Sequence, residues 1–188
     1  LGFVDTWASV NSGGLSLSEN YLYTTEAFRA YYEHLTDDGV LVVLRWPTDT
    51  PRLVSNAIAL LGIEEAARRI VALTERREGD RDNESQMLFM LRKRPFTEAE
   101  TGTIINDWTQ ARPMLVPGRH ADPPYADLFA GRKTMAQYIE EAPRRVGPVF
   151  DDSPFYFAVE LPLCMATRIA RALLTVVLPV LLLPGLFV

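Results

Sequence analysis

The chain has 188 residues, of which 48% are hydrophobic and 23% are charged, and its formal net charge is −5 with a sequence pI near 5.1. This composition is ordinary for a globular domain with a hydrophobic core. The acidic balance excludes nucleic acid as a partner, because binding phosphates requires a basic face. Cys164 is the only cysteine, which excludes an internal disulfide and fits a reducing compartment.

The first half of the chain alternates short β-rich runs with helical stretches. Residues 1–4 predict the end of a buried strand and there is no initiator Met, so we expect a fragment of a larger protein. Thr25 can cap a helix whose apolar residues recur with a 3.6-residue period. The elements that follow are a strand at residues 40–44, continuously apolar and expected to be buried on both faces, and a helix at residues 52–61.

The second half contains two further apolar runs, at residues 69–74 and 86–91. The polar connector between them lacks the apolar face of a crossover helix, so we expect an antiparallel pair, with a helix start and one strand as the alternative. The remaining predicted elements are a helix at 97–111, a proline-rich loop at 112–124, and short helices at 125–130 and 134–142.

This order of elements predicts an α/β fold, the C-terminal half of a doubly wound parallel sheet. Ligands bind such sheets beyond the carboxyl ends of the strands. Asp5, which ends the first strand, and Arg45-Trp46, which ends the next, are therefore expected at one edge.

The C-terminal residues 172–188 carry no charge, and Arg168 and Arg171 precede them. As a helix with a rise of about 1.5 Å per residue, the run reaches about 25 Å. We expect a soluble domain at residues 1–160, a juxtamembrane linker at 161–171 and the start of a transmembrane helix at 172–188. The basic residues favour a cytoplasmic location for the soluble domain. The alternative is a buried core helix.

Several short motifs, taken in order, resemble the membrane-associated spermidine-synthase-like proteins of bacteria. These motifs are Asp5-Thr6-Trp7, residues 17–24, residues 26–28, Asp38-Gly39, Arg45-Trp46 and residues 151–157. The resemblance implies the Rossmann-like methyltransferase fold, a location at the bacterial inner membrane with membrane lipid as a partner, and a homodimer.

The resemblance also implies a cofactor and a catalytic residue. The cofactor is S-adenosylmethionine or its decarboxylated form, with Thr6 and Trp7 as contacts, although the glycine-rich turn that binds it is not in this sequence. By position, Asp5 matches the aspartate that orients the acceptor amine and accepts its proton. A carboxylate suits this role, because it attracts a cation and removes a proton from it. The alternative is a strand-end carboxylate that caps a loop.

Further polar residues are candidates for binding a small amine substrate. Glu19, Asn20, Tyr21 and Tyr23 can line an amine-sized pocket, or else dock the following helix onto the sheet. Asp151 and Asp152 can hold a cation, or else form a turn before Ser153-Pro154.

No metal site is expected. His34 and His120 are far apart in the sequence and have no ligand partners at metal-binding spacing.

Two classes of function follow from the sequence. The first is a membrane-tethered transferase that moves an aminopropyl or methyl group to an amine. The second is a transferase-like module that binds or regulates a partner without catalysis.

Overall fold

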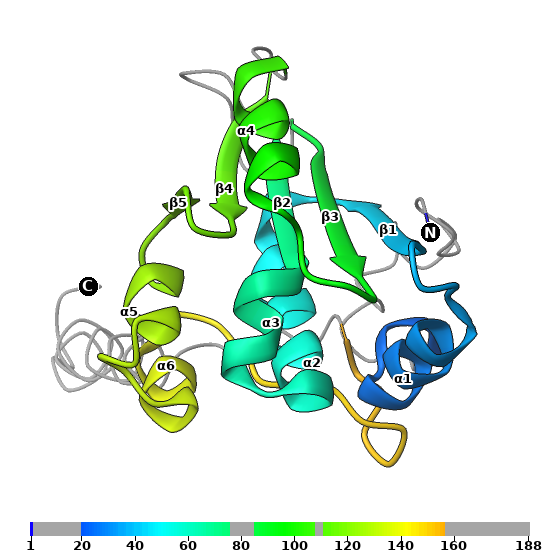
Figure 1. Cartoon of the computed structure of the whole chain (residues 1–188). Coiled ribbons are helices and arrows are strands. Elements are labelled where there is room, and N and C mark those ends of the chain that lie inside the picture. Colours follow the sequence, from blue (N-terminus) through cyan, green and yellow to red (C-terminus); the bar gives the residue numbers. More distant parts are fainter. Residues whose placement is uncertain (2–19, 76–84, 108–110, 157–188) are drawn as a thin grey trace, which may run out of the picture.

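The structure is a computed structural model that describes residues 1, 20–75, 85–107 and 111–156 (Figure 1). Its described residues form a five-stranded sheet in the order β1-β3-β2-β4-β5. The strands are β1 (Val40–Arg45), β2 (Ile70–Thr74), β3 (Met87–Arg92), β4 (Arg112–Val116) and β5 (His120–Ala121). Each of these strands is antiparallel to its neighbours.

The prediction of a doubly wound, Rossmann-like parallel sheet is therefore wrong. The predicted antiparallel pair of β2 and β3 is confirmed, with Ala72 opposite Phe89. This pair explains the error, because β3 also pairs with β1 and so lies between β1 and β2. β1 and β2 run in the same direction, but the strand between them runs the opposite way.

Of the six α-helices in the described residues, all but α3 lie largely where the sequence predicts them. They are α1 (Thr25–His34), α2 (Thr50–Leu61), α3 (Ile63–Arg69), α4 (Glu98–Asp107), α5 (Tyr125–Phe129) and α6 (Met135–Glu141), with short 3-10 helices η3 (Tyr21–Tyr23) and η4 (Pro47–Asp49). The cap of α1 is Thr24 rather than Thr25, because the Thr24 side chain accepts a hydrogen bond from the Ala27 amide. The predicted loop at 112–124 is also wrong in part, since β4 and β5 form there despite the prolines.

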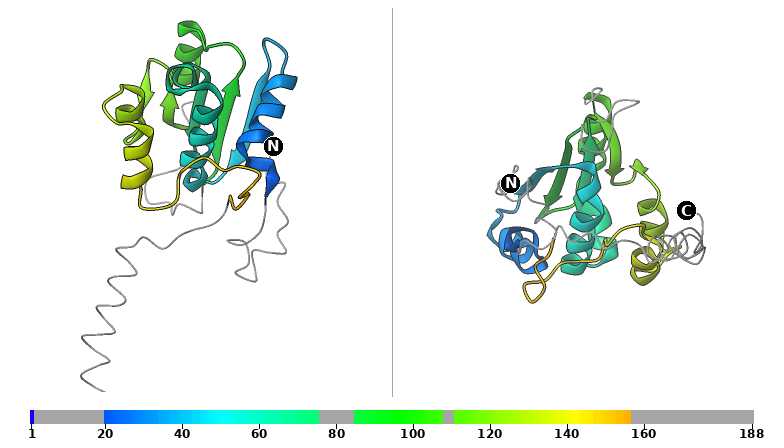
Figure 2. Two further views of the ribbon diagram at one scale, coloured as in Figure 1. Left: turned by 90° about the horizontal axis from the view of Figure 1, so that it is seen from below. Right: turned by 180° about the vertical axis from the view of Figure 1, so that it is seen from behind.

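The sheet buries both of its faces, but to different extents. One face packs against α1, α2, α3, α5 and α6, where Phe28, Leu53 and Phe89 are fully buried. The other face carries a smaller cluster of Val71, Leu73 and Val116, against which Ile104 of α4 packs. Figure 2 shows α2 over the sheet in the view from behind, whereas α4 lies over it in Figure 1.

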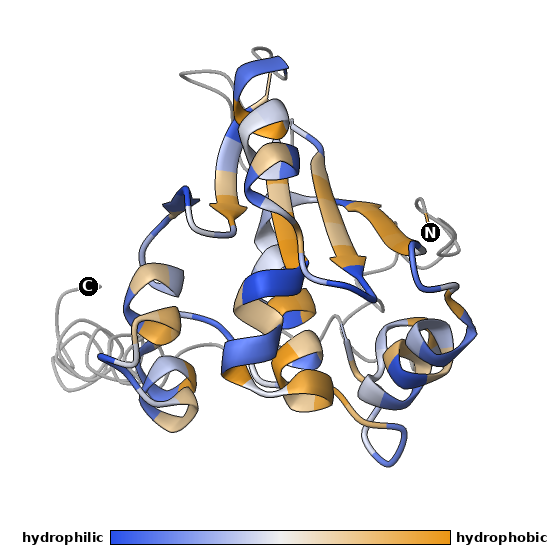
Figure 3. Ribbon diagram, in the orientation of Figure 1, coloured by the Kyte–Doolittle hydropathy of each residue, from blue (hydrophilic) through white to orange (hydrophobic). Residues whose placement is uncertain are grey.

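β1 differs from the expectation that both of its faces are buried. Its residues alternate between buried and more exposed positions. Val43 is fully buried, whereas Val42 is 39% exposed. Residues 40–44 of the strand are all hydrophobic, and Figure 3 shows this part in orange, so hydropathy alone does not decide which of its residues are buried.

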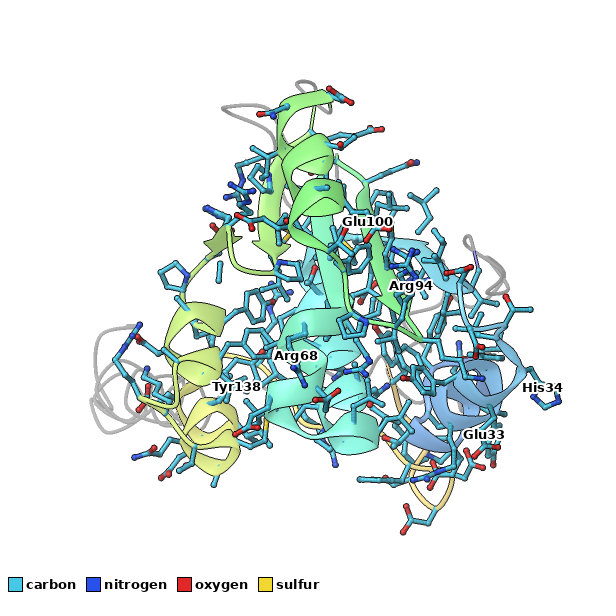
Figure 4. The ribbon with its side chains drawn as sticks, viewed as in Figure 1. Glu33, His34, Arg68, Arg94, Glu100 and Tyr138 are labelled. Carbon is cyan, nitrogen blue, oxygen red and sulfur yellow. The ribbon has the colours of Figure 1, made fainter. Side chains whose placement is uncertain are left out.

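Glu100 fastens α4 to the end of β3. Its carboxylate accepts hydrogen bonds from Arg92, Arg94 and the Thr97 amide, at 2.6, 3.0 and 2.8 Å. The Thr97 amide bond and the bond from Arg92 lower the pKa of Glu100 to about 2. Figure 4 shows Arg94 and Glu100 close together where β3 leads into α4.

The predicted membrane location is also corrected. Among the described residues, no helix combines the length and the apolar character needed to cross a membrane. The expected membrane segment at 172–188 and the domain boundaries at 160 and 171 lie outside the described residues.

The neighbouring valines of β1 test this arrangement of faces. We expect Val43→Ala to lower the free energy of unfolding by about 2 kcal/mol, because it removes buried methyl groups and leaves a cavity. Val42→Ala is the matched control and should change it by about 0.5 kcal/mol or less. Urea denaturation of both variants measures the difference, and equal effects would contradict the assigned faces.

Candidate functional site

The structure describes five of the residues proposed from the sequence as site residues. Asp5, Thr6, Trp7 and Glu19 lie outside the described residues. The five described residues are Asn20, Tyr21, Tyr23, Asp151 and Asp152.

Two segments that carry these residues lie side by side although they are far apart in the sequence. The Asn20 amide donates to the Pro154 carbonyl at 2.7 Å, and the Thr25 amide donates to the Val149 carbonyl at 2.7 Å. In Figure 1 the yellow-to-orange segment after α6 runs past α2 to α1. The two segments that the sequence analysis proposed for amine binding therefore lie next to each other. Residues that share one binding site must be neighbours in this way.

Of the five described candidate residues, only Tyr23 is buried. The Asn20 side chain accepts from the Leu22 amide at 3.1 Å and so caps η3, and Tyr21 is 52% exposed. Asp151 and Asp152 are exposed in a turn closed by a hydrogen bond from the Ser153 amide to the Phe150 carbonyl. The turn that the sequence left as an alternative for these two aspartates is the arrangement found.

A cluster of buried polar side chains lies beyond the carboxyl end of β1. We call this the polar cluster, and its members are Tyr23, Arg45, Asp49, Arg52 and Tyr156. Except for Asp49, whose side chain is 15% exposed, each of them is at most 6% exposed.

The contacts within the polar cluster join two distant segments, one containing Tyr23 and the other Tyr156, to the end of β1 and to the turn before α2. The Arg45 Nε donates to Asp49 Oδ2 at 2.9 Å. The Arg45 guanidinium lies 5.2 Å from the centre of the Tyr23 ring, and that ring lies 4.7 Å from the ring of Tyr156. The Tyr156 hydroxyl donates to the Asp49 carbonyl at 3.3 Å.

Two side chains of α2, one turn apart, hold this arrangement in place. The Arg52 Nε donates to the Arg145 carbonyl at 2.7 Å, and its Nη1 donates to the Phe155 carbonyl at 3.1 Å. The Asn56 Nδ2 donates to the Tyr23 carbonyl at 2.6 Å, and its Oδ1 accepts from the Val149 amide at 2.9 Å. Because positions four residues apart share a helix face, one face of α2 binds both segments.

Burial dominates the electrostatics of the cluster. It raises the pKa of Tyr23 to about 12, with the charge of Asp49 adding to the effect. It raises the pKa of Tyr156 well above 10.0. Burial also raises the pKa of Asp49, although Arg45 and the Trp46 amide act in the opposite direction. At neutral pH the two phenols are therefore neutral hydrogen-bond donors.

The sequence analysis identified part of this cluster and missed the rest. Tyr23 and Arg45 were singled out, whereas Asp49, Arg52 and Asn56 were not. Arg52 and Asn56 could have been noticed as two polar residues at i and i+4 on a helix whose neighbouring positions are apolar. Their partners could not have been found, because they lie 93 to 103 residues away in the chain.

Leu1 lies beside β1. Its amino group donates to the Val42 carbonyl at 2.7 Å, and its carbonyl accepts from the Leu44 amide at 2.9 Å. Leu1 thus bonds to the residues before and after Val43, which is the hydrogen-bond pattern of two parallel strands. One residue is not a strand, and Asp5 follows four positions later, outside the described residues.

Within the described ranges, no group of three His, Cys, Asp or Glu side chains is placed to hold a metal ion. His34 lies at the outer end of α1, as Figure 4 shows, and its Nδ1 is 2.7 Å from the Ala30 carbonyl. His120 is 2.9 Å from Asp122, on β5.

Comparison with known proteins gives no match to a protein family, a curated protein or a solved structure.

The raised pKa of Asp49 makes stability depend on pH in a defined direction. The Asp49 carboxyl binds its proton more tightly in the folded state than in the unfolded state, where its pKa is near 3.8. Protonated Asp49 therefore favours the folded state, and this contribution to stability is lost as the pH rises from 3.8 through the folded pKa. We expect the free energy of unfolding of the wild type, relative to Asp49→Asn, to fall as the pH rises above 3.8. Urea denaturation over this range measures it. A relative stability that rises with pH would mean that Arg45 outweighs burial.

Proposed function

We propose that this chain forms the acceptor side of a group-transfer site of the spermidine-synthase-like kind. The reaction is transfer of an aminopropyl or methyl group to a small amine, with S-adenosylmethionine or its decarboxylated form as the donor. The sequence motifs suggest this class of reaction, and the proposal assigns Asp5 as the base.

The proposal is supported by one structural observation, which is that residues from three separate motifs are in contact. Three of the motifs that resemble the family are separate in the sequence: residues 17–24, Arg45-Trp46 and residues 151–157. In the structure, Tyr23, Arg45 and Tyr156, one from each motif, meet in the polar cluster. A structural role for any one motif does not require the three to meet, whereas a shared site does.

The cluster offers groups suited to an amine acceptor. An amine attacks only when neutral, so a site for it needs an acceptor for the proton and hydrogen bonds that fix the nitrogen. Asp49 is a largely buried carboxylate with a raised pKa, and Tyr23 and Tyr156 remain protonated beside it. Asp49 can bind a cationic acceptor, while removal of the proton is assigned to Asp5.

The donor side of the site falls on residues outside the described part of the chain. Thr6 and Trp7, the predicted cofactor contacts, are among them. When bound, the donor supplies an activated carbon next to a sulfonium. The contribution of this chain is to place the acceptor nitrogen and take its proton.

A binding or regulatory module without catalysis is the second candidate function. It is favoured by the closure of the cluster, since Tyr23 is fully buried and Tyr156 is 1% exposed. A sealed polar cluster also serves to fix the position of the segment that covers it.

The test is turnover by the protein with labelled donor and putrescine. We expect Asp5→Asn to lower turnover by about 100-fold or more, because general-base catalysis contributes at least that much. The control is Asp151→Asn combined with Asp152→Asn, which should retain turnover within about twofold because both side chains lie in an exposed turn.

An absence of turnover with any small amine, together with no binding of the donor by calorimetry, would reject the transferase. An equal loss of turnover in the control variant would reject the assignment of Asp5 as the base.

A further inference from the structure

The segment that covers the polar cluster has no helix or strand of its own. We call residues 145–156 the strap. Its fixed points are the carbonyls of Arg145 and Phe155, bound by Arg52, and the Val149 amide, bound by Asn56. Two backbone bonds join the strap to Asn20 and to Thr25, the first residue of α1. The Asp151 amide also donates to Glu26 Oε2 at 3.1 Å.

The other described elements around the cluster are held differently. β1 is paired with β3 along six residue pairs, from Val40 opposite Arg92 to Arg45 opposite Met87. α2 has the internal hydrogen bonds of a twelve-residue helix and a hydrophobic face in the core. Opening β1 or α2 breaks the sheet or the helix. Lifting the strap breaks bonds from side chains and single amides, and it exposes Val146, Val149 and Tyr156, which are buried in the larger hydrophobic cluster, but it leaves the sheet and α2 intact. Local opening of this kind leaves the rest of the molecule folded.

The strap also presents a mixture of buried and exposed residues that suits a lid. Val149, Pro154 and Tyr156 are buried against the molecule, whereas Phe150 is 41% exposed and the turn at 151–153 is exposed. Figure 2 shows the strap crossing from α6 to α1 along one side of the molecule. Its inner surface includes the Tyr156 ring, which lies on Tyr23 and reaches the Asp49 carbonyl.

We propose that the strap is a lid over the polar cluster, and that Arg52 and Asn56 are the latch that holds it closed. The lid opens while the sheet stays intact, and a small amine reaches Asp49 through that opening. The inference rests on the proposed function for the identity of the guest. Arg52 and Asn56 act as positioning residues, because they hold the strap rather than the reacting atoms.

Amide hydrogen exchange tests the lid without any need for turnover. In the wild type, we expect the strap amides of Val149 and Tyr156 to exchange at least 100-fold faster than the β3 amides of Phe89 and Leu91. Arg52→Lys keeps the charge but cannot reach two carbonyls with a planar fork. It should speed exchange of the strap amides about tenfold and leave β3 within twofold.

Two further variants make the test specific. Arg68→Lys is the matched control, because Arg68 is 59% exposed on α3, and it should change neither set of amides. Tyr156→Phe keeps the ring and removes the hydroxyl, which donates to the Asp49 carbonyl, and it should also speed strap exchange. If Arg52→Lys does not fold, Tyr156→Phe decides the question. Strap amides that exchange together with β3, in the wild type or in Tyr156→Phe, would overturn the lid.

The same variants separate the lid from the proposed function. With putrescine as the probe, Arg52→Lys should raise KM about tenfold and change kcat less, because the guest is retained only when the strap closes again. Independent strap exchange without turnover supports the lid and rejects the transferase. Turnover with strap amides that exchange only with β3 rejects the lid and supports the transferase.

Discussion

The described structure depends on the buried polar face that α2 presents through Arg52 and Asn56. A hydrogen bond from a charged donor contributes about 1.5–3 kcal/mol, and a buried carbonyl left without its donor costs about 1–3 kcal/mol. Arg52 satisfies two carbonyls of the strap and Asn56 joins the strap to Tyr23. These bonds act together with the burial of Val146, Val149 and Tyr156 and with the backbone bonds from Asn20 and Thr25. The position of Tyr156, and with it the cluster, follows from α2.

The sheet supplies the base on which α2 sits. Leu53, Val54 and Ala57 of α2 are fully buried in the larger hydrophobic cluster, next to strand residues such as Val43 and Phe89. The two faces of α2 therefore have different contacts. The apolar face packs against the sheet, and the polar face binds the strap. This division places buried charged groups at the end of β1, next to the larger hydrophobic cluster. It also explains why burial, rather than any single ion pair, has the largest effect on the pKa values there.

Local sequence predicted the elements better than their arrangement. The helical period before Leu35 predicted α1, with its cap threonine one residue from the predicted place, and the polar connector after Thr74 predicted the antiparallel pair. α3 is not among the predicted elements. The strand order was not accessible in this way. Whether β2 or β3 pairs with β1 depends on side-chain packing between residues about 50 positions apart, and both strands are equally apolar. The two strands after Ala111 were missed because prolines favour loops, although Pro113 is accommodated in β4.

What the sequence determined by itself is the set of segments: an α/β composition, the helices, the apolar strands, and the motifs around Tyr23, Arg45 and Tyr156. These properties are local, because they follow from periodicity, caps and turn residues within a few positions. Only the tertiary structure decided that the sheet is antiparallel, that Asp151 and Asp152 lie in an exposed turn, and that Asp49 and Arg52 belong to the cluster. Each of these depends on which distant segments bury one another, and burial is a property of the folded chain as a whole.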